Sequence, residues 1–337
     1  MNWYLQSGKD SDVVISIRIR YARNFRNYKF GIKEKEEANK IEEEIKAKLS
    51  NIGYELKLLR LRDMDDLTKM SLLEKNIINA DCAMDKNGIC DILINDDENI
   101  CIILNDREHI KLQVFSGSFN LDETFNLAKE IDQKLQDNFD IAKSKKYGYL
   151  THNLTEVGTG MRVSVMVHLP GLTKTGNIKK VLESVSSFGL NIRGVYGENS
   201  KISGDMYQIS NKQTLGITEE DIIKNLKIIT EKIIEQERTA RRILAKNQVL
   251  LEDMVYRSFG ILSNCRKISS EEARNLLSDV KLGTDLGIIK EITDSKILEM
   301  YLYSKPANLQ KKIGQNLDAY DRDIKRAEII KEIIGRN

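Results

Sequence analysis

The 337-residue chain is poor in the features that mark several large classes of protein. It has four cysteines, three histidines, two prolines and one tryptophan. Its 53 lysines and arginines nearly balance 51 aspartates and glutamates, a net charge of +2. So small a net charge gives no support for a nucleic-acid or membrane-surface partner, and any basic function must be local. Nowhere do 18 apolar residues follow one another, which argues against a membrane-spanning helix.

Other missing signals narrow the chemistry. The sequence has no G-x-x-x-x-G-K-[ST] loop, so a bound nucleotide would be held mainly by side-chain charge. The start, Met1-Asn2-Trp3-Tyr4, lacks the basic residues and apolar run of a secretory signal. The cysteines show no paired metal-ligand spacing, and we expect no resident metal site and a reducing, cytoplasmic location. They are Cys82, Cys90, Cys101 and Cys265.

The composition and the length are typical of a folded protein with two domains. Hydrophobic residues make up 41% of the chain and charged residues 31%, enough for a core and a solvated surface. At roughly 150 residues per domain, the length suggests two domains. We place the boundary near residue 240.

Periodicity predicts several elements. Ala38, Ile41, Ile45 and Leu49 have helical spacing, so residues 34–49 are expected to form a charged surface helix. Short β-branched runs in residues 90–115 predict a hairpin, and residues 178–188 predict a helix. Thr218, with Asp221 three residues later, is a capping pattern that predicts the start of a long helix. Helical periodicity then continues to the end of the chain.

Three segments concentrate arginines in an unusual pattern. In Ser16-Ile17-Arg18-Ile19-Arg20 and in Met161-Arg162-Val163-Ser164-Val165-Met166, polar and apolar residues alternate. The third segment is Arg193-Gly194-Val195-Tyr196-Gly197-Glu198. On strands, such alternation would turn the guanidinium groups toward one polyphosphate while the intervening side chains face a core.

These segments, in this order, resemble those of the phosphagen (guanidino) kinase family, and specifically its bacterial protein-arginine kinase branch. The resemblance extends to residues 147–151 and 208–211 and to the string Arg322-Asp323-Ile324-Lys325-Arg326-Ala327, and so covers nearly the whole chain. It implies an α+β fold: an antiparallel sheet flanked by helices in a catalytic domain of residues 1–240, followed by a small all-α domain of residues 241–337.

The resemblance also implies ATP and Mg²⁺ as cofactors, with arginines binding the phosphates. Such a site suits phosphoryl transfer, which needs positioning and charge neutralisation more than covalent help. The implied nucleotide-binding residues are Ser16, Ile17, Arg18, Ile19, Arg20, Asn76, Lys111, Arg162, Val163, Ser164, Val165, Met166, Arg193, Gly194, Val195, Tyr196, Gly197 and Glu198.

Catalysis requires a carboxylate that orients the acceptor guanidinium and helps remove its proton. By resemblance Glu198 does part of this work. The family's N-E-E-D-H string reads Asn105-Asp106-Arg107-Glu108-His109 here, so that Arg107 stands where the family has its base. If the segment is extended, Asp106 and Glu108 share one face and either could replace the base. Otherwise Arg107 occupies the base position and the chain is a weak kinase or a pseudokinase.

Further positions depart from the family. Lys111 replaces a phosphate-binding arginine, Asn76 a nucleotide-contacting histidine and Asn153 a reactive cysteine. Lysine keeps the charge but loses the bidentate fork of arginine. We expect His109 to be a positioning residue and His168 to be structural.

The string at residues 322–327 resembles a phosphoarginine-binding motif of this branch. On a helix Arg322 and Arg326 share a face with Asp323 beside them, so arginines could bind phosphate while the aspartate pairs the guanidinium. The implied function is ATP-dependent phosphorylation of arginine residues in proteins; the alternative is a degenerate scaffold that reads phosphoarginine. The family further implies a Clp-type unfoldase and protease, stress control, a zinc-binding activator protein and a homo-oligomer.

Overall fold

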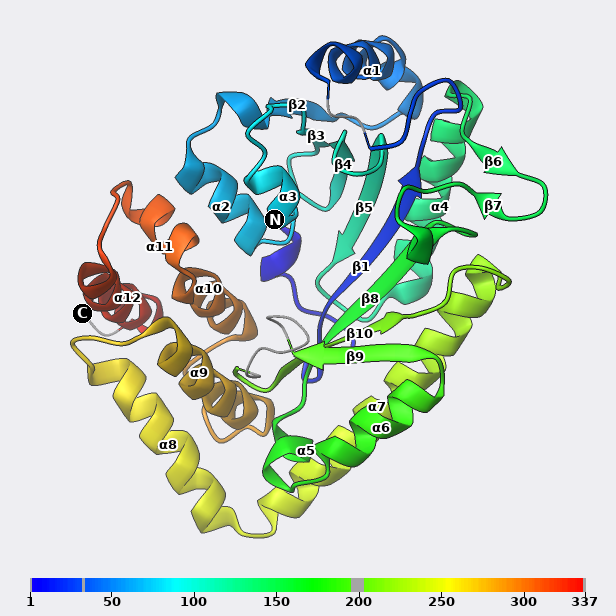
Figure 1. The fold of residues 1–337 in the computed structure, drawn as a ribbon. Coiled ribbons are helices and arrows are strands. Elements are labelled where there is room, and N and C mark those ends of the chain that lie inside the picture. The colour runs from blue at the N-terminus through cyan, green and yellow to red at the C-terminus, as the bar shows by residue number, and fades with distance from the viewer. Residues whose placement is uncertain (1, 32–33, 195–202, 336–337) are drawn as a thin grey trace.

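A computed structural model of the chain describes residues 2–31, 34–194 and 203–335. Within these residues eight strands form one sheet, in the order β2-β3-β4-β5-β1-β8-β10-β9, and every neighbouring pair is antiparallel (Figure 1). A short hairpin of β6 and β7 lies apart from it. The strands are β1 (Val14–Arg23), β2 (Lys57–Arg60), β3 (Asp91–Ile94), β4 (Ile100–Leu104), β5 (Ile110–Ser116), β6 (Lys143–Ser144), β7 (Gly148–Tyr149), β8 (Met161–His168), β9 (Leu190–Gly194) and β10 (Met206–Asn211).

Helices flank the sheet and then make up the rest of the chain. Up to residue 245 they are α1 (Lys35–Lys48), α2 (Asp66–Glu74), α3 (Ala80–Ala83), α4 (Leu121–Asn138), α5 (Pro170–Lys174), α6 (Ile178–Ser187) and α7 (Glu219–Ala245). After it come α8 (Gln248–Asn264), α9 (Ser270–Asp285), α10 (Asp294–Ser304), α11 (Pro306–Ile313) and α12 (Ala319–Ile334). Single 3₁₀ turns are η1 (Trp3–Leu5), η2 (Leu49–Ile52), η3 (Leu61–Asp63) and η4 (Leu154–Glu156).

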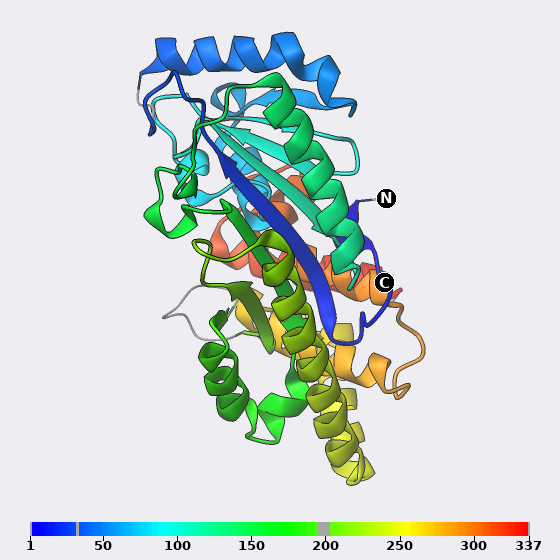
Figure 2. The same cartoon turned by 90° about the vertical axis from the view of Figure 1, so that its right-hand side faces the viewer.

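The two faces of the sheet are covered differently. On one face, α4 and α7 run along the strands and enclose the main hydrophobic core (Figure 2). On the other, η1, α2 and α3 cover only the half made by β3, β4 and β5, in a smaller cluster. The strand half made by β1, β8, β10 and β9 is left to carry polar side chains on this second face.

The predicted elements are confirmed. The charged helix is α1, the hairpin is β3 and β4, and the helix near residue 180 is α6. Thr218 caps α7 by accepting the amide of Asp221, and its hydroxyl donates to the Asp221 carboxylate. The fold class is confirmed too: an antiparallel sheet flanked by helices, followed by helices alone.

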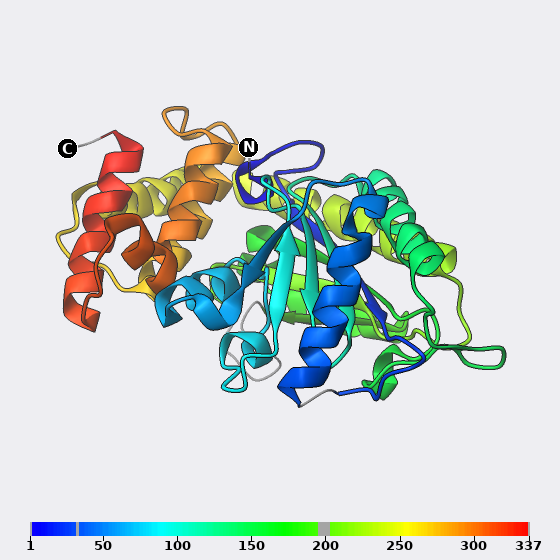
Figure 3. The same cartoon turned by 90° about the horizontal axis from the view of Figure 1, so that it is seen from above.

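Helices α8 to α12 pack around a hydrophobic cluster of their own and gather at one end of the molecule, yellow to red in Figure 3. They meet the preceding part of the chain chiefly where α11 packs on α2. There the Glu74 carboxylate accepts the amides of Ala307 and Asn308 at 2.8 and 2.9 Å, at the start of α11. A carboxylate at this position satisfies backbone donors that the first turn of a helix leaves free.

Candidate functional site

Strand register brings the predicted arginines together. Arg18 lies opposite Ser164, and Arg20 lies opposite Arg162, across the pair of β1 and β8. Because side chains alternate along a strand and directly paired residues share a face, these four point to the same side. Arg193 on β9 joins them through Gln208 of β10, which is paired with both Arg193 and Met166.

We call Arg18, Arg20, Arg162 and Arg193 the cationic face. The proximity of these groups is seen in the pKa of Arg18, which lies well below its ordinary value because of burial and then because of the charges of Arg20, Arg162 and Arg193. The pKa of Arg20 is also lowered, by burial and by Arg193, although Glu156 and Asp106 oppose the shift. The face therefore brings four guanidinium groups within electrostatic reach of one another.

The apolar residues of the same segments pack in the hydrophobic core. Ile17, Ile19, Val163 and Val165 are fully buried in the main core, on the opposite face of the sheet. Their side chains face away from the cationic face, so any contact with a nucleotide there would come from their backbone, and their predicted part in nucleotide binding stays a prediction. They hold the strands whose alternate residues form the site, as the alternation predicts.

Not every predicted residue can be placed. Arg193 and Gly194 end β9 and lie within the described residues. Val195, Tyr196, Gly197 and Glu198 lie outside the described residues, and their predicted roles remain predictions.

A pocket adjoins Arg18. Trp3 stacks on Phe115 with ring centroids 4.7 Å apart, and both line the pocket beside Asn76, whose carbonyl accepts from Arg18 at 3.4 Å. Sequence reasoning missed Trp3, Phe115 and Gln208. The alternation of β5, where Lys111, Gln113 and Phe115 share the face of Arg20, would have found Phe115. The remaining lining residues are Ser16, Arg18, Ser164, Met166 and Gln208.

Residues 105–109, which include the position of the family's catalytic base, form a turn and not an extended strand. Asn105 has a φ of 55°, in the left-handed region, and its amide donates to the carbonyl of His109 at 3.1 Å. Asp106 and Glu108 therefore diverge, and the expectation that they share a face is wrong. The sequence pattern gave no sign of the positive φ, which asparagine tolerates better than most residues.

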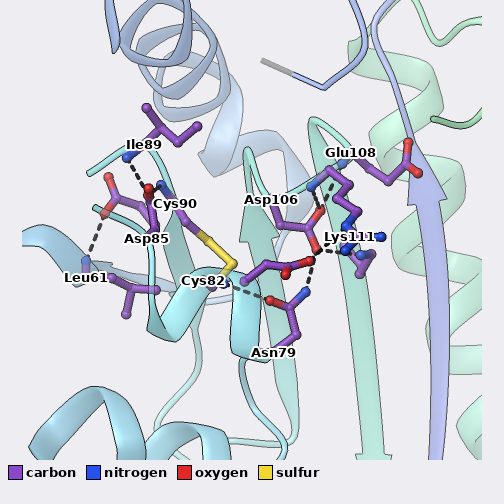
Figure 4. The surroundings of a disulfide bond; sticks show 12 residues. Leu61, Asn79, Cys82, Asp85, Ile89, Cys90, Asp106, Glu108 and Lys111 are labelled. Carbon is purple, nitrogen blue, oxygen red and sulfur yellow. Dashed lines mark hydrogen bonds and ion pairs between the residues drawn. A yellow bond between two sulfur atoms is a disulfide. The ribbon is translucent and has the colours of Figure 1, made fainter. Parts of the chain in front are cut away.

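Asp106 is turned toward Lys111, with which it forms an ion pair, and its Oδ2 also accepts from Asn79 at 2.8 Å (Figure 4). Burial would raise the pKa of Asp106, but Lys111 and the backbone amides of Glu108 and Arg107 outweigh burial and lower it. Asp106 is thus an ionised carboxylate within electrostatic reach of Arg20. Of the two predicted carboxylates in this turn, it is the one that faces the cationic face.

Glu108 is buried and directed elsewhere. Its carboxylate accepts the amides of His152 and Asn153 at 2.9 and 3.1 Å and a hydrogen bond from the Asn24 side chain. With both oxygens engaged in this way, Glu108 fixes the chain at residues 152–153. The Glu108 carboxylate is therefore directed away from the cationic face, and its predicted role as a base stays a prediction.

Arg107 lies at the surface. Its side chain is 60% exposed, and its Nε donates to Asp81 of α3 at 2.8 Å. The guanidinium is therefore paired with a carboxylate outside the cationic face.

A carboxylate that the sequence analysis did not consider adjoins the site. Glu156 of η4 is largely buried, and its Oε1 lies 3.9 Å from Nη2 of Arg20. It precedes the glycine-rich turn that leads into β8, and only the folding of that turn onto β1 brings the two residues together.

The histidines are engaged in the fold. His109 accepts the amide of Phe25 at Nδ1, and its Nε2 lies 2.8 Å from the carbonyl of Lys29. Burial lowers the pKa of His109, which favours the neutral ring that these two contacts require. His168 is fully buried, with Nε2 2.9 Å from the hydroxyl of Ser278. Both fit the expected positioning and structural roles.

The predicted phosphoarginine string lies at the start of α12. Arg326 is buried, and its guanidinium donates to the carbonyls of Ser304 and Ile268, each at 2.8 Å, and to Asp323. Arg322 is only half-buried and donates to the carbonyl of Leu317 at 3.0 Å. Arg326 and Asp323 thus already pair within the protein, whereas Arg322 is the more accessible member.

The described residues lack two further features. In those ranges no cluster of three or more His, Cys, Asp or Glu side chains is arranged to hold a metal ion. None of the helices described is both long and apolar enough to cross a membrane.

Comparison with known structures relates the fold to two kinases of known structure. The duplicated taurocyamine kinase of Schistosoma mansoni, with bound transition-state analogue components, matches with a TM-score of 0.60 at 22% identity. The match covers 77% of this chain and 38% of that one. Lombricine kinase matches with a TM-score of 0.58 at 22% identity, over 68% of this chain and 67% of its own. At such identities the likeness shows the fold alone.

Sequence comparison is more specific. A protein-arginine kinase of Bacillus cereus (strain G9842) is 41% identical over 336 residues, covering 98% of this chain and 94% of its own. One of Halothermothrix orenii is 43% identical over 333 residues, with coverages of 98% and 95%. The family described as "ATP:guanido phosphotransferase, C-terminal catalytic domain" matches residues 37–240, and "Protein-arginine kinase McsB C-terminal domain" matches residues 248–336. The chain thus belongs to the guanidino kinase family, in its protein-arginine kinase branch.

Proposed function

We propose that the protein transfers the γ-phosphoryl group of ATP to arginine side chains of other proteins. The observation that carries the proposal is the cationic face, where three strands bring four guanidinium groups close enough to lower the pKa of Arg18. Guanidinium groups gathered in a partly buried site favour a polyanionic ligand. The relatives named protein-arginine kinase support arginine as the acceptor.

In this proposal the phosphates of ATP lie on the cationic face. Ser16, Ser164 and Met166 on the same face would flank the nucleotide beside Arg18. Mg²⁺ would be held mainly by the phosphates, since the described residues provide no carboxylate cage for it. The protein's own part is to neutralise charge on the transferred group.

Asp106 and Glu198 are the proposed carboxylates for the acceptor. Asp106 is ionised and near Arg20, and Asn79 and Lys111 enclose its side chain, which is fully buried. In the proposal, binding of the substrates draws Lys111 away, and Asp106 then orients the acceptor arginine and takes up its proton. Lys111, in turn, would approach the phosphates from the same side. Glu108 has a structural part in this scheme.

The remaining expectations are part of the same proposal. Residues 1–240 would form the catalytic domain, and residues 241–337 a helical domain that binds phosphoarginine through Arg322, with Asp323 and Arg326 beside it. The protein would act in the cytoplasm as a homo-oligomer, under stress-related control, marking substrates for a Clp-type unfoldase and assisted by a zinc-binding activator protein. These partners rest on the family resemblance.

The test is incubation of the full chain with ATP, Mg²⁺ and an unfolded arginine-rich protein, followed by detection of acid-labile phosphate. Asp106→Asn should lower the transfer rate by about 10²- to 10⁴-fold, the usual contribution of a positioned base, and leave ATP binding measurable. Asp96→Asn, which changes an exposed carboxylate in the turn between β3 and β4, is the matched control. A wild-type chain that binds phosphoarginine but transfers nothing would instead support the scaffold function.

Arg107→Glu distinguishes two explanations for the changed string at residues 105–109. Either Asp106 has replaced the family's base, or residue 107 still occupies the base position. If Asp106 is the working carboxylate, a glutamate at this exposed position should change the transfer rate by less than about tenfold. A newly positioned base would change the rate by more than that, about 10²-fold at least. A gain of 10²-fold or more would show instead that residue 107 reaches the acceptor and that Asp106 is not the base.

A further inference from the structure

A disulfide joins Cys82 of α3 to Cys90, the residue before β3 (Figure 4). Both cysteines are almost fully buried, in the hydrophobic cluster under β3, β4 and β5. Cys101 and Cys265 are free. The spacing of the cysteines in the sequence gave no indication of this pair.

A short chain of contacts runs from the disulfide to Asp106. Asn79 caps α3 by accepting the amide of Cys82 at 2.9 Å with its Oδ1. The Nδ2 of the same side chain donates to Oδ2 of Asp106 at 2.8 Å. One asparagine thus connects the disulfide-bonded helix to the carboxylate that faces the cationic face, as Figure 4 shows.

The position of α3 depends on this covalent link. A helix of four residues has too few hydrogen bonds to be stable by itself. The turn that follows it is organised separately, since the Asp85 carboxylate accepts the amides of Asn87, Ile89 and Cys90 at 2.7 to 2.9 Å. The disulfide adds a covalent tie from the helix to that turn and to β3, beside the packing of Cys82 and Ala83 in the hydrophobic cluster.

We propose that Cys82 and Cys90 form a reversible redox pair that sets the position of Asp106 through Asn79. Disulfides in reducing compartments are usually transient and often redox-sensing, which fits a pair beside a proposed active site. Reduction would proceed by attack of a small thiol on one sulfur, giving a mixed disulfide and one free cysteine. A second thiol would then release the other cysteine, so that two thiols are oxidised to one disulfide as the protein's disulfide gains two electrons and two protons.

The inference rests on the proposed function in so far as Asp106 is the acceptor carboxylate. In the oxidised state Asn79 holds Asp106 in place. In the reduced state α3 is freed, the hydrogen bond from Asn79 is weakened, and Asp106 is held by Lys111 and its own turn. Since a misplacement of about 1 Å can cost up to about 100-fold in rate, phosphoryl transfer should fall by as much as that.

The experiment compares the full chain equilibrated with oxidised and with reduced dithiothreitol, using three measurements. Thiols titrated after denaturation should number two in the oxidised chain, Cys101 and Cys265, and four after reduction. Amide hydrogen exchange in residues 79–83 and 106–108 should be faster after reduction. Formation of acid-labile phosphate on the protein substrate should be slower.

Variants identify the route of the effect. Cys82→Ser with Cys90→Ser should behave like the reduced chain under both conditions, and reduced wild type serves in its place if that variant does not fold. Asn79→Ser keeps a capping hydroxyl but loses the donor to Asp106, so residues 106–108 should stop responding while the disulfide still forms. Cys265→Ser, a free cysteine of α8 to α12, should respond as wild type does.

The outcomes separate this inference from the proposed function. Four thiols after oxidation, or identical exchange at residues 106–108 in both states, would overturn the redox proposal. Exchange that responds in a chain without phosphoryl transfer in either state would uphold the redox pair and overturn the kinase function. A transfer rate that is equal in both states despite a change in exchange would show that Asp106 is not positioned by the pair.

Discussion

The arginines of the cationic face and Arg326 of α12 were both predicted to bind phosphate groups, yet their surroundings differ. Arg18 is near three other arginines, which together with burial hold its pKa well below the ordinary value. Arg326 is buried too, but its guanidinium donates to two backbone carbonyls and to Asp323. An arginine surrounded by like charges is arranged for an anionic ligand, whereas one with internal acceptors stabilises the fold.

The largest effect is expected at the cationic face. Arg18→Ala should lower the rate of phosphoryl transfer by about 10²- to 10³-fold, since a charge-assisted contact to the transferred group is worth roughly 3 to 4 kcal/mol. Stability against urea should be unchanged or slightly greater, because the substitution removes repulsion from neighbouring arginines.

The control for Arg18→Ala is Arg26→Ala, which removes an exposed arginine paired with Asp140. Its transfer rate should match that of the wild type. A loss of stability in Arg18→Ala, with the rate preserved, would mean that the cationic face is a structural feature after all.

Arg326→Met should have the opposite profile. It preserves much of the side-chain volume but leaves the carbonyl of Ile268 and the carboxylate of Asp323 without the donor Arg326, while the carbonyl of Ser304 keeps only the hydroxyl of Ser270, so the unfolding free energy should fall by about 2 to 4 kcal/mol. Urea denaturation measures this. Lys325→Ala, next to it and paired with Glu328 at the surface, should change it by less than about 1 kcal/mol. If the stability of Arg326→Met is unchanged, the internal contacts of Arg326 contribute nothing and a ligand role is favoured.

A smaller, pH-dependent effect is expected at Asp285. This carboxylate pairs with Arg241 and Lys281 at 3.0 and 2.9 Å, yet burial raises its pKa from 3.8 to about 6. The folded chain therefore binds this proton more tightly than the unfolded chain, and its contribution to stability is full below pH 4 and is lost as the pH rises through 6.

Urea midpoints between pH 4 and pH 6.5 measure the effect of Asp285. The wild type should lose about 1 to 3 kcal/mol over this range relative to Asp285→Asn, which cannot titrate at residue 285. Parallel pH profiles of the two proteins would show that Asp285 keeps an ordinary pKa and that its two cations compensate its burial.

The smallest effect is expected for Lys111→Arg. The guanidinium could keep the ion pair with Asp106 and add a second donor toward a phosphate, so ATP affinity should rise by less than about tenfold. Titration calorimetry with Mg²⁺ and ATP measures this. A weakened affinity would mean that the fork of arginine does not fit between Asp106 and the cationic face.

Local patterns predicted much of the fold. The spacing of Ala38, Ile41 and Ile45 marks one face of α1, and Thr218 with Asp221 marks the start of α7. Both are properties of consecutive residues, which is why they can be read without a structure. The alternation in β1 and β8 likewise separated the arginines from the apolar residues of the core.

The turn at residues 105–109 could not be predicted from local patterns of this kind. Its sequence is compatible with a strand, and only the positive φ of Asn105 and the contacts of the folded chain separate Asp106 from Glu108. The ion pair of Arg20 with Glu156 and the stacking of Trp3 on Phe115 also join residues more than a hundred positions apart. Pairwise contacts over such distances depend on register and on packing, not on local periodicity.

The sequence by itself determined which residues are cationic, which strands alternate and to which family the chain belongs, because these depend on residue type and local order. The tertiary structure decided the surroundings of each charge: it placed Arg18 among arginines, gave Arg326 several internal acceptors, and turned Asp106 and not Glu108 toward the cationic face. The physical reason is that the strength of a charge in a protein depends on burial and on neighbours, and both are set only when distant segments pack together.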